Sequence, residues 1–591
     1  MTGSEGSVVP FTIERMPFTA QAIDRGGLEM EMFRDWPIVY LLDDARRVYV
    51  GESLHGVSRM RQHQASEAKQ GMRTLRLVLS EMFNKSVCLD LESTLIRLFQ
   101  GDGSFHVVNR NIGIVDAGYY QRERYREAFR EIFEELRAGG MFQRTIPQIE
   151  NSELYKFSPF KTLTADQAVA VGEIVESLLQ DFESDDGGIS IIQGDPGTGK
   201  TIVAVYLLKL LSDIAAYQDG DEADPEEMFS EHFDESTRDL MADRRMAFVV
   251  PQESLRHAIQ SVFSRLPSMS EVKVLTAFEV GESEEDFDLV IVDEAHRLNQ
   301  YAMQAHGTQL KRFRDITTKL FGHLDEDKNQ LDWIRAKSRH VVLMLDLHQS
   351  VRPADIPRAE LEAVVGQARE RGRVHPLHTQ MRAAGGNDYI AYVRDLMAGR
   401  SPERRLSFGE YEFTMFDDAG ALKNRIEALE PEYGLCRMTA GFAWPWRSNP
   451  RGKIRADHDF ELDGTAFRWN SVTTDWVNSP RAPSEVGSIH TLQGYDLNYA
   501  GVIIGPELRF DPYEQRLWVD RAHYADRNGK IDNRLRGQTT TDDDLLHYVT
   551  NAYAVLLTRG MRGTFVYVCD PQLRRHLERA DEVLPAIAAW S

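Results

Sequence analysis

The segment from Gly194 to Thr201 constrains the fold of this chain more than any other feature. Its letters, GDPGTGKT, match the pattern G-x-x-x-x-G-K-[ST], with the apolar stretch ISIIQ before it and the helix-forming stretch IVAVYLLKLL after it. Glycines allow backbone N–H groups to wrap around phosphates, and the N-terminus of the helix adds favourable partial charge. The sequence therefore predicts a nucleotide phosphate-binding loop between a strand and a helix of an α/β fold.

The residues of this loop have separate expected roles with ATP. Lys200 would place its positive charge at the β- and γ-phosphates, and the hydroxyl of Thr201 would be a ligand of Mg²⁺. The rest of the loop would cradle the phosphates: Gly194, Asp195, Pro196, Gly197, Thr198 and Gly199.

A second apolar strand ends in an acidic pair. In DLVIVDEAHR, Asp293 and Glu294 follow the apolar run, so we expect them at an edge of the same sheet as the loop. Asp293 would hold the magnesium ion, directly or through water, and Glu294 would polarise the attacking water. The DEAH wording resembles the second ATPase motif of the superfamily 1 and 2 helicases.

Three further segments extend this resemblance. KTLTADQ resembles the adenine-reading segment of superfamily 1 helicases, which gives Gln167 the role of contacting the base. VVLMLDLHQ resembles the third motif, which senses the γ-phosphate, through Asp346 and Gln349. LHTQMRAAGG places Arg382 where the family has an arginine that contacts phosphate.

The C-terminal part carries two more such motifs. SIHTLQGYDLNYAG resembles the fifth motif through four residues: His490, Gln493, Gly494 and Asp496. NAYAVLLTRGMRG resembles the sixth, with Arg559 as an arginine finger and Arg562 as a second candidate. With MTAGFAWPW and RWN, the segments from about Lys161 to Leu577 resemble the Schlafen-group-three-like DNA/RNA helicases. This resemblance implies a motor in which an arginine from one domain reaches a nucleotide on another.

An independent pattern lies near the N-terminus. Ile38-Val39-Tyr40 and Tyr49-Val50-Gly51 resemble the paired strands of the GIY-YIG nucleases, although Pro37 stands where the first glycine is expected. Arg59 and His63 are four residues apart, which places them on one face of a helix. The resemblance adds Glu92, in LDLESTLIRLF, and Asn109, for which Asn111 is an alternative.

Phosphodiester cleavage requires an activated water, a cation that offsets developing charge, and a donor to the phosphate oxygens. The resemblance gives Glu92 the role of holding Mg²⁺ or Mn²⁺ and Arg59 that of contacting the scissile phosphate. Tyr49 or His63 would take the proton from water, and Tyr40 would orient this network.

The length of 591 residues exceeds what one hydrophobic core supports, so the chain should contain several domains. We expect a small α+β GIY-YIG-type domain followed by two tandem RecA-like P-loop domains with parallel sheets, an α/β class. The expected division is an N-terminal extension (1–35), the nuclease-like domain (36–118), a helical connector (119–158), a first RecA-like domain (159–370) and a second (371–591). An acidic stretch at about 219–239 would be a surface insertion of the first.

Composition narrows the location and the partners. The formal charge of −23 argues against a protein that coats nucleic acid nonspecifically, although the arginines of 46–76 and 122–137 could still meet a phosphate backbone. The three cysteines lack zinc or disulfide spacing, and there is no apolar run long enough for a bilayer and no secretory signal. These features favour a cytoplasmic protein without a membrane partner.

The sequence thus predicts an ATP-dependent nucleic-acid motor coupled to a metal-dependent nuclease, with a role in genome defence, antiviral defence or DNA processing. DNA is favoured over RNA as the partner, and the oligomeric state is open. One alternative is an ATP-driven switch that binds nucleic acid or protein without unwinding. Another is a nuclease directed at RNA.

Overall fold

The computed structural model divides the chain into two compact units. The first comprises Met1–Asp186, Thr201–Met246 and Ala258–Lys273, and the second comprises Gly187–Lys200, Ala247–His257 and Val274–Ser591. The structure describes residues 9–66, 69–109, 119–161, 163–184, 186–218, 228–302, 307–347, 349, 353–400, 407–448, 457–472, 475–492, 495–526, 528–530, 532–533, 535, 537 and 539–578. Among the helices of these residues, none is both long enough and apolar enough to cross a membrane.

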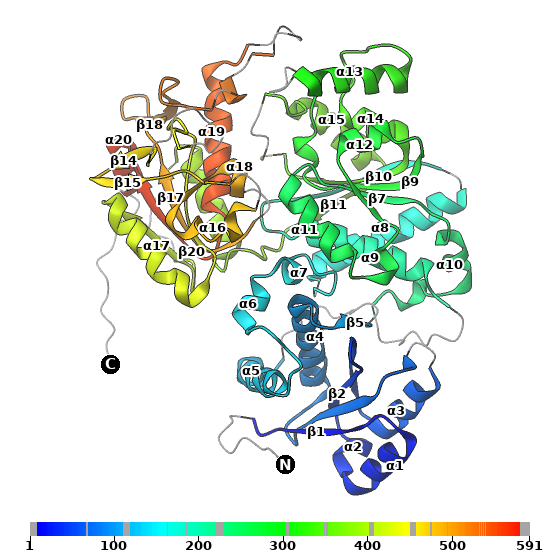
Figure 1. Ribbon diagram of the computed structural model, residues 1–591. Helices are drawn as coiled ribbons and strands as arrows, with labels where there is room; N and C mark the ends of the chain where they lie inside the picture. The colour runs from blue at the N-terminus through cyan, green and yellow to red at the C-terminus, as the bar shows by residue number, and fades with distance from the viewer. Residues whose placement is uncertain are drawn as a thin grey trace. The chain divides into compact units, whose positions relative to one another are not determined.

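The first unit contains a five-stranded sheet with the order β1-β4-β2-β3-β5 (Figure 1). Its strands are β1 (Thr12–Pro17), β2 (Ile38–Asp43), β3 (Arg47–Ser53), β4 (Thr74–Leu79) and β5 (His106–Val107). The paired strands expected from the sequence are β2 and β3, which run antiparallel with Tyr40 opposite Gly51. Strand β1 pairs with β4, so the sheet already begins before Trp36, within the segment expected to be an extension.

Helices make up the rest of the first unit. They are α1 (Ala20–Glu29), α2 (Glu31–Asp35), α3 (Gly56–Ala65), α4 (Lys85–Asp102), α5 (Arg122–Ala138), α6 (Ile146–Glu150), α7 (Glu153–Lys156), α8 (Ala165–Ser184) and α10 (Glu235–Met241), together with most of α9 (Lys200–Ala215) and of α11 (Glu253–Phe263). The expected connector helix is α5, and its buried side chains recur at helical spacing: Tyr125, Ala128, Phe129, Ile132, Phe133 and Leu136. The acidic stretch falls partly on residues 219–227, which lie outside the described residues.

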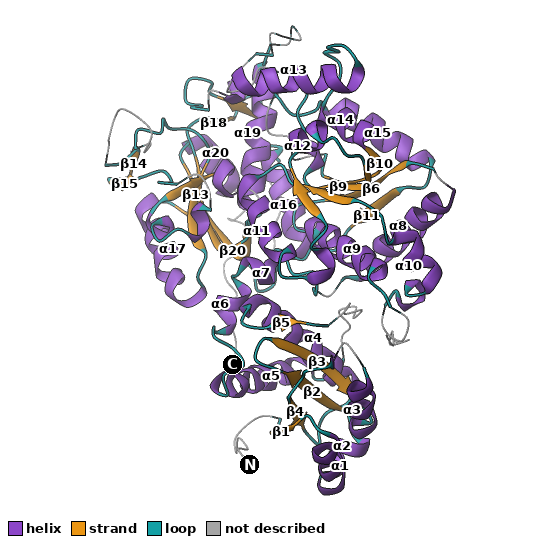
Figure 2. Ribbon diagram, turned by 45° about the vertical axis from the view of Figure 1, so that its right-hand side comes forward, coloured by secondary structure: helices purple, strands orange, loops and turns teal. Residues whose placement is uncertain are grey.

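Two sheets dominate the second unit (Figure 2). The first has the order β11-β6-β10-β9-β7-β8, and its pairs β11–β6, β6–β10 and β10–β9 are parallel. Its strands are β6 (Gly188–Gly194), β7 (Met246–Val249), β8 (Lys273–Leu275), β9 (Phe287–Val292), β10 (Ser338–Leu345) and β11 (Val374–Leu377). Because β11 lies beside β6, this sheet continues past the boundary expected at residue 370. The helices of this part are α12 (Ala277–Glu282), α13 (Gly307–Phe321), α14 (Gln330–Lys337) and α15 (Arg358–Glu370).

The second sheet is parallel throughout, with the order β12-β20-β17-β13-β16. Its strands are β12 (Glu412–Phe416), β13 (Cys436–Ala440), β16 (Val486–Ser488), β17 (Leu497–Ile504) and β20 (Gly560–Val568). Two small hairpins accompany it, β14 (Phe460–Leu462) with β15 (Thr465–Phe467) and β18 (Leu508–Asp511) with β19 (Arg516–Val519). The helices are α16 (Gly386–Met397), α17 (Ala419–Tyr433), α18 (Ile489–Leu492), α19 (Asp542–Leu557) and α20 (Pro571–Glu578). Parallel sheets in an α/β chain are what the sequence predicts.

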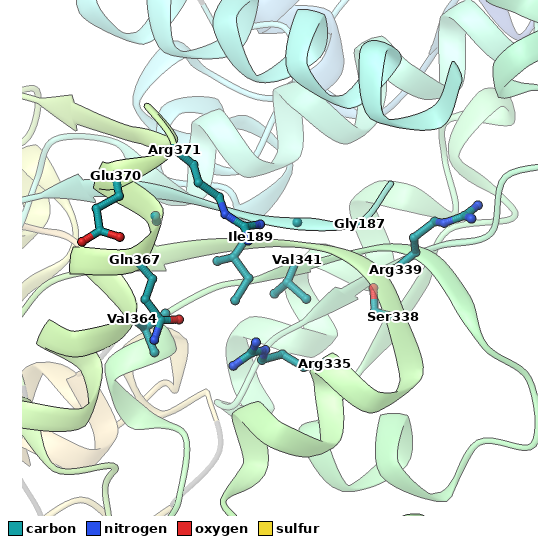
Figure 3. A pocket seen from close by; sticks show the side chains of 12 residues that line it. Gly187, Ile189, Arg335, Ser338, Arg339, Val341, Val364, Gln367, Glu370 and Arg371 are labelled. Carbon is teal, nitrogen blue, oxygen red and sulfur yellow. The ribbon is translucent and has the colours of Figure 1, made fainter. Parts of the chain in front are cut away.

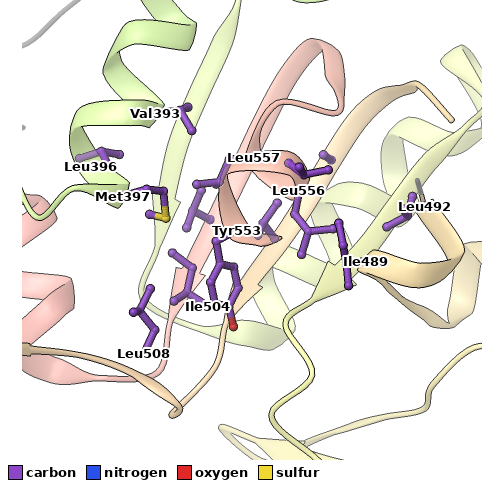
Figure 4. Close-up of a cluster of buried hydrophobic side chains, with 14 of the residues drawn as sticks. Val393, Leu396, Met397, Ile489, Leu492, Ile504, Leu508, Tyr553, Leu556 and Leu557 are labelled. Atoms are coloured by element: carbon purple, nitrogen blue, oxygen red, sulfur yellow. The ribbon is translucent and has the colours of Figure 1, made fainter. Parts of the chain in front are cut away.

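Alternate residues of β17 pack into two different hydrophobic cores. On β17, Val502 and Ile504 belong to a cluster with α16 and α19, shown in part in Figure 4, whereas Tyr499 and Ile503 belong to a cluster with α17. Successive side chains of a strand point to opposite faces, so this sheet is covered on both. Trp444 is partly buried and packs against the second cluster, stacked on Phe460 with ring centroids 4.0 Å apart.

Candidate nucleotide site and N-terminal polar cluster

The predicted phosphate-binding loop follows the last residue of β6. Gly197 and Gly199 have φ angles of +87° and +78°, a conformation that side chains with a Cβ rarely adopt. The ammonium group of Lys200 donates hydrogen bonds to the carbonyl oxygens of Gly194, at 2.6 Å, and Asp195, at 3.0 Å. The loop therefore curls around the lysine, and Thr201 follows in the first turn of α9.

Residues after β11 hold this loop, and the sequence did not point to them. The side chain of Gln380 donates to the carbonyl of Pro196 at 2.7 Å, and the backbone N–H of Met381 donates to that of Gly197 at 2.9 Å. A Cβ on Gly197 would lie only 2.0 Å from Oε1 of Gln380, and together with its positive φ angle this contact favours glycine there. Arg394 adds an ion pair with Asp195 at 2.5 Å. The sequence feature that could have indicated Gln380 is its position two residues before Arg382.

The acidic pair follows β9. Asp293 is 1% exposed, and one of its carboxylate oxygens accepts the backbone N–H of Glu294 at 3.0 Å. Glu294 has a φ of +48°, a strained backbone for a residue with a side chain, and such strain is often found at functional sites. Its carboxylate lies 3.0 Å from Nε2 of His296. Burial alone would raise the pKa of Glu294, but His296, Lys200 and Arg297 outweigh it and hold that pKa below its usual value.

Both predicted arginines interact with Asp496. Arg382 forms an ion pair with Asp496, and Arg559, which is 2% exposed, donates to the carbonyl of Tyr495 at 3.2 Å. Burial and, to a smaller extent, the charge of Arg382 lower the pKa of Arg559 to about 10, although Asp496 and Glu294 oppose this shift. The second unit thus brings Lys200, Glu294, Arg382 and Arg559 into one electrostatic network.

The remaining residues predicted for the nucleotide site have other surroundings. Nε2 of Gln349 donates a hydrogen bond to a carboxylate oxygen of Asp346 at 2.7 Å. Both residues follow β10 in the sequence, and both side chains are buried. Arg562 lies over the ring of Tyr433, 5.1 Å from its centroid. In the first unit, Oε1 of Gln167 accepts the backbone N–H of Thr164 at the start of α8. His348, Gln493 and Gly494 lie outside the described residues.

Two oxygen donors predicted from the sequence suit a magnesium ion. Mg²⁺ prefers oxygen ligands and keeps several waters, so one or two protein groups plus nucleotide phosphates complete its coordination. The carboxylate of Asp293 and the hydroxyl of Thr201 are donors of this type. Among the described residues no group of three or more histidine, cysteine or acidic side chains forms a closed metal site, and a nucleotide-bound magnesium needs none.

The N-terminal sheet carries a second polar cluster. The hydroxyl of Tyr40, on β2, lies 2.7 Å from Nε2 of His63, on α3, and both side chains are buried. The ring of Tyr49, on β3, contacts both, with centroids 6.1 Å from Tyr40 and 5.2 Å from His63. Arg59 and Glu92 both act electrostatically on Tyr40. The structure therefore brings together the five residues that the sequence had placed here from two strands and two helices.

Burial sets the protonation of this cluster. It raises the pKa of Tyr40, and it lowers that of His63 to about 3, helped by the charges of Lys69 and Arg59. His63 is therefore neutral near neutral pH, and burial makes its ring nitrogen a weak base. A Cβ on Gly51 would lie 2.3 Å from the hydroxyl of Tyr40, which gives a steric reason for the glycine of the Tyr49-Val50-Gly51 pattern.

Asn109 has a different surrounding from the one expected of a group that contacts substrate. Its side-chain oxygen accepts the backbone N–H of Val50 at 3.1 Å, and its side-chain nitrogen donates to the carbonyl of Val50 at 2.7 Å. The amide thus pairs with β3 as a neighbouring strand would, beside Tyr49. The alternative, Asn111, lies outside the described residues. The sequence missed Lys85, which pairs with Glu52 at 2.6 Å next to Gly51.

A phosphate-binding loop and an acidic pair, each after a strand of one largely parallel sheet, define a P-loop nucleotide-hydrolase site. A model of the Schlafen group 3, DNA/RNA helicase domain matches residues 188–570. The chain belongs to this family. The sequence-based resemblance to a helicase is therefore confirmed, whereas the comparisons do not show a GIY-YIG domain.

The chain is also similar to individual proteins. The Uncharacterized protein YPL245W of Saccharomyces cerevisiae is 26% identical over 471 residues, which cover 73% of this chain and 94% of that protein. Among solved structures, arterivirus nonstructural protein 10, a helicase, is 12% identical with a TM-score of 0.27 over 68% of this chain, which spans only 64% of the viral protein. The Pif1 helicase from Bacteroides, in complex with ADP-AlF3 and ssDNA, is 12% identical with a TM-score of 0.24 over 69% of this chain and 92% of its own.

Proposed function

We propose that this protein is an ATP-driven nucleic-acid motor, a helicase or translocase. The observation that carries the proposal is the ion pair between Arg382, which follows the first sheet of the second unit, and Asp496, which precedes β17 of the second sheet. Arg559, directly before β20, belongs to the same network as Glu294. Groups from both sheets would therefore meet one nucleotide.

This arrangement suits conversion of chemical energy into movement. Lys200 and the loop would bind the phosphates of ATP, Glu294 would orient and polarise water, and Arg559 and Arg382 would stabilise charge on the transferring phosphoryl group. Magnesium, held through Asp293 and Thr201, would neutralise phosphate charge. Since the arginines come from the second sheet or contact it, hydrolysis and release of phosphate would change how the two sheets are held together.

Strand displacement separates a motor from an ATP-driven switch that binds nucleic acid or protein without unwinding. Wild-type protein with ATP should displace a labelled strand from partial duplexes with either a 5′ or a 3′ overhang, and Lys200→Ala should not. We expect DNA duplexes to be preferred over matched RNA duplexes. ATP-dependent binding without displacement or translocation on any of these substrates would favour the switch.

A second activity is proposed for the N-terminal cluster: metal-dependent cleavage of a phosphodiester. The hydrogen-bonded pair of Tyr40 and His63, with Tyr49, Arg59 and Glu92 around it, supports this proposal. Tyr49 or His63 would accept the proton of water, and Arg59 would bind the phosphate. Glu92 would hold Mg²⁺ or Mn²⁺, which supplies positive charge to the phosphate.

The two activities together would suit DNA processing or genome defence, including antiviral defence, because a motor can bring a nuclease to selected substrates. A nuclease directed at RNA is the alternative. Cleavage of matched labelled DNA and RNA by the same preparation distinguishes the two.

A further inference from the structure

A cavity of about 350 Å³ lies in the second unit, away from the phosphate-binding loop. It is lined by the first residues of β6 and β10, by the ends of α14 and α15, and by the turn after α15. The phosphate-binding loop follows the opposite, carboxyl end of β6. A strand of 7 residues, at about 3.3 Å per residue, separates the two by about 20 Å. The cavity is therefore distinct from the nucleotide site described above.

The chemistry of the cavity combines an apolar floor with a cationic rim. Ile189, Val341, Val364 and Ala368 supply apolar surface. The charged residues of the lining are three arginines and one acid, so its formal charge is net positive: Arg335, Arg339, Arg371 and Glu370. In Figure 3, Arg371 extends towards Ile189, and Arg335 lies across Ile189 and Val341 from it.

Two of these arginines are available to a ligand. Arg335 and Arg371 are exposed, and among the described residues neither guanidinium has a carboxylate partner. This contrasts with the many exposed arginines of the chain that are paired, such as Arg358 with Glu362 on α15. In a chain with a formal charge of −23, unpaired guanidinium groups around one cavity concentrate positive potential.

We propose that this cavity binds a small phosphorylated molecule, a phosphate monoester with an apolar or aromatic body, of the size of a nucleoside monophosphate. Guanidinium groups bind phosphate through charge-assisted, often bidentate hydrogen bonds. Small-molecule pockets typically have volumes of about 300–1,000 Å³, and the volume of this cavity falls within that range. The backbone phosphates of nucleic acid alone would not require the apolar floor formed by Ile189 and Val341.

The test uses AMP as the probe and the full-length Lys200→Ala variant, so that the phosphate-binding loop contributes little. Calorimetric titration to about 1 mM AMP, a range in which even a weak site fills, should show one saturable site. Adenosine, which lacks the phosphate, should not bind. Adding Arg335→Gln and Arg371→Gln together should weaken AMP binding at least about tenfold, because charged hydrogen bonds are lost. Arg358→Gln, on the same helix as Val364 and Ala368 but outside the cavity, is the matched control and should bind AMP as before.

Several outcomes would overturn the proposal. These are the absence of AMP binding, equal binding of adenosine and AMP, or binding that persists in the double variant. Loss of oligonucleotide binding in the double variant without any AMP site would assign the arginines to nucleic acid instead. Both arginines are exposed, so the variants should keep the melting temperature of the parent. If the double variant melts at a lower temperature, AMP binding by each single variant is measured instead. The result is independent of the motor proposal, because ATP hydrolysis and strand displacement are not read out.

Discussion

Replacement of Glu294 by glutamine should reduce ATP hydrolysis by about 10²- to 10⁴-fold, the usual contribution of a positioned acid or base. The change removes the carboxylate that would polarise water but keeps its size, and it leaves Lys200 bonded to the loop carbonyls. ATP binding should therefore survive. Steady-state phosphate release, together with equilibrium binding of a labelled ATP analogue, measures the two effects separately.

Two comparison variants sharpen this result. Lys200→Ala should lose both binding and hydrolysis, whereas Glu362→Gln, a surface acid of α15, should retain both. If Glu294→Gln hydrolyses ATP at the wild-type rate, the acidic pair after β9 is not the hydrolytic site.

Replacement of Glu92 by alanine should reduce nucleic-acid cleavage at least about 10²-fold, since it removes the group proposed to hold the metal that offsets charge on the phosphate. Labelled duplex DNA with Mg²⁺ or Mn²⁺ is the substrate, and EDTA should abolish cleavage by the wild type. Glu127→Ala, an exposed acid of α5 in the same unit, is the matched control and should cleave normally. ATP hydrolysis by Glu92→Ala should be unchanged.

Cleavage by Glu92→Ala at the wild-type rate would refute the proposed role of the N-terminal cluster. If the wild type cleaves no substrate, including RNA and branched DNA, while ATP is hydrolysed, the motor proposal stands without the nuclease.

The parts of the nucleotide site that the sequence could predict are those built from neighbouring residues. A loop between an apolar strand and a helix is a local pattern, and so is an acid pair directly after a strand. Gln380 and Arg394 could not be found in this way, because they lie far along the chain from the loop. They come close to it only in the folded sheet, where β11 pairs with β6.

In the N-terminal region, too, local patterns were predictable and long-range contacts were not. The pairing of β2 with β3 was predictable because a short turn joins two apolar stretches, and Tyr40 and Tyr49 follow from it. Strand β1 was missed because TIERMP mixes charged and apolar residues and pairs with β4, far along the chain. The bonding of Asn109 to the backbone of Val50 is likewise a long-range contact, which a spacing rule cannot distinguish from a role in contacting substrate.

We expect ATP hydrolysis at the loop of Gly194 to Thr201 to be coupled to nucleic acid. The most direct test is the steady-state ATPase rate of the full-length protein at saturating ATP and magnesium, without nucleic acid and with single-stranded DNA or RNA. A strong increase with nucleic acid that is lost in Lys200→Ala is the predicted result. A basal rate that no nucleic acid changes would contradict the motor.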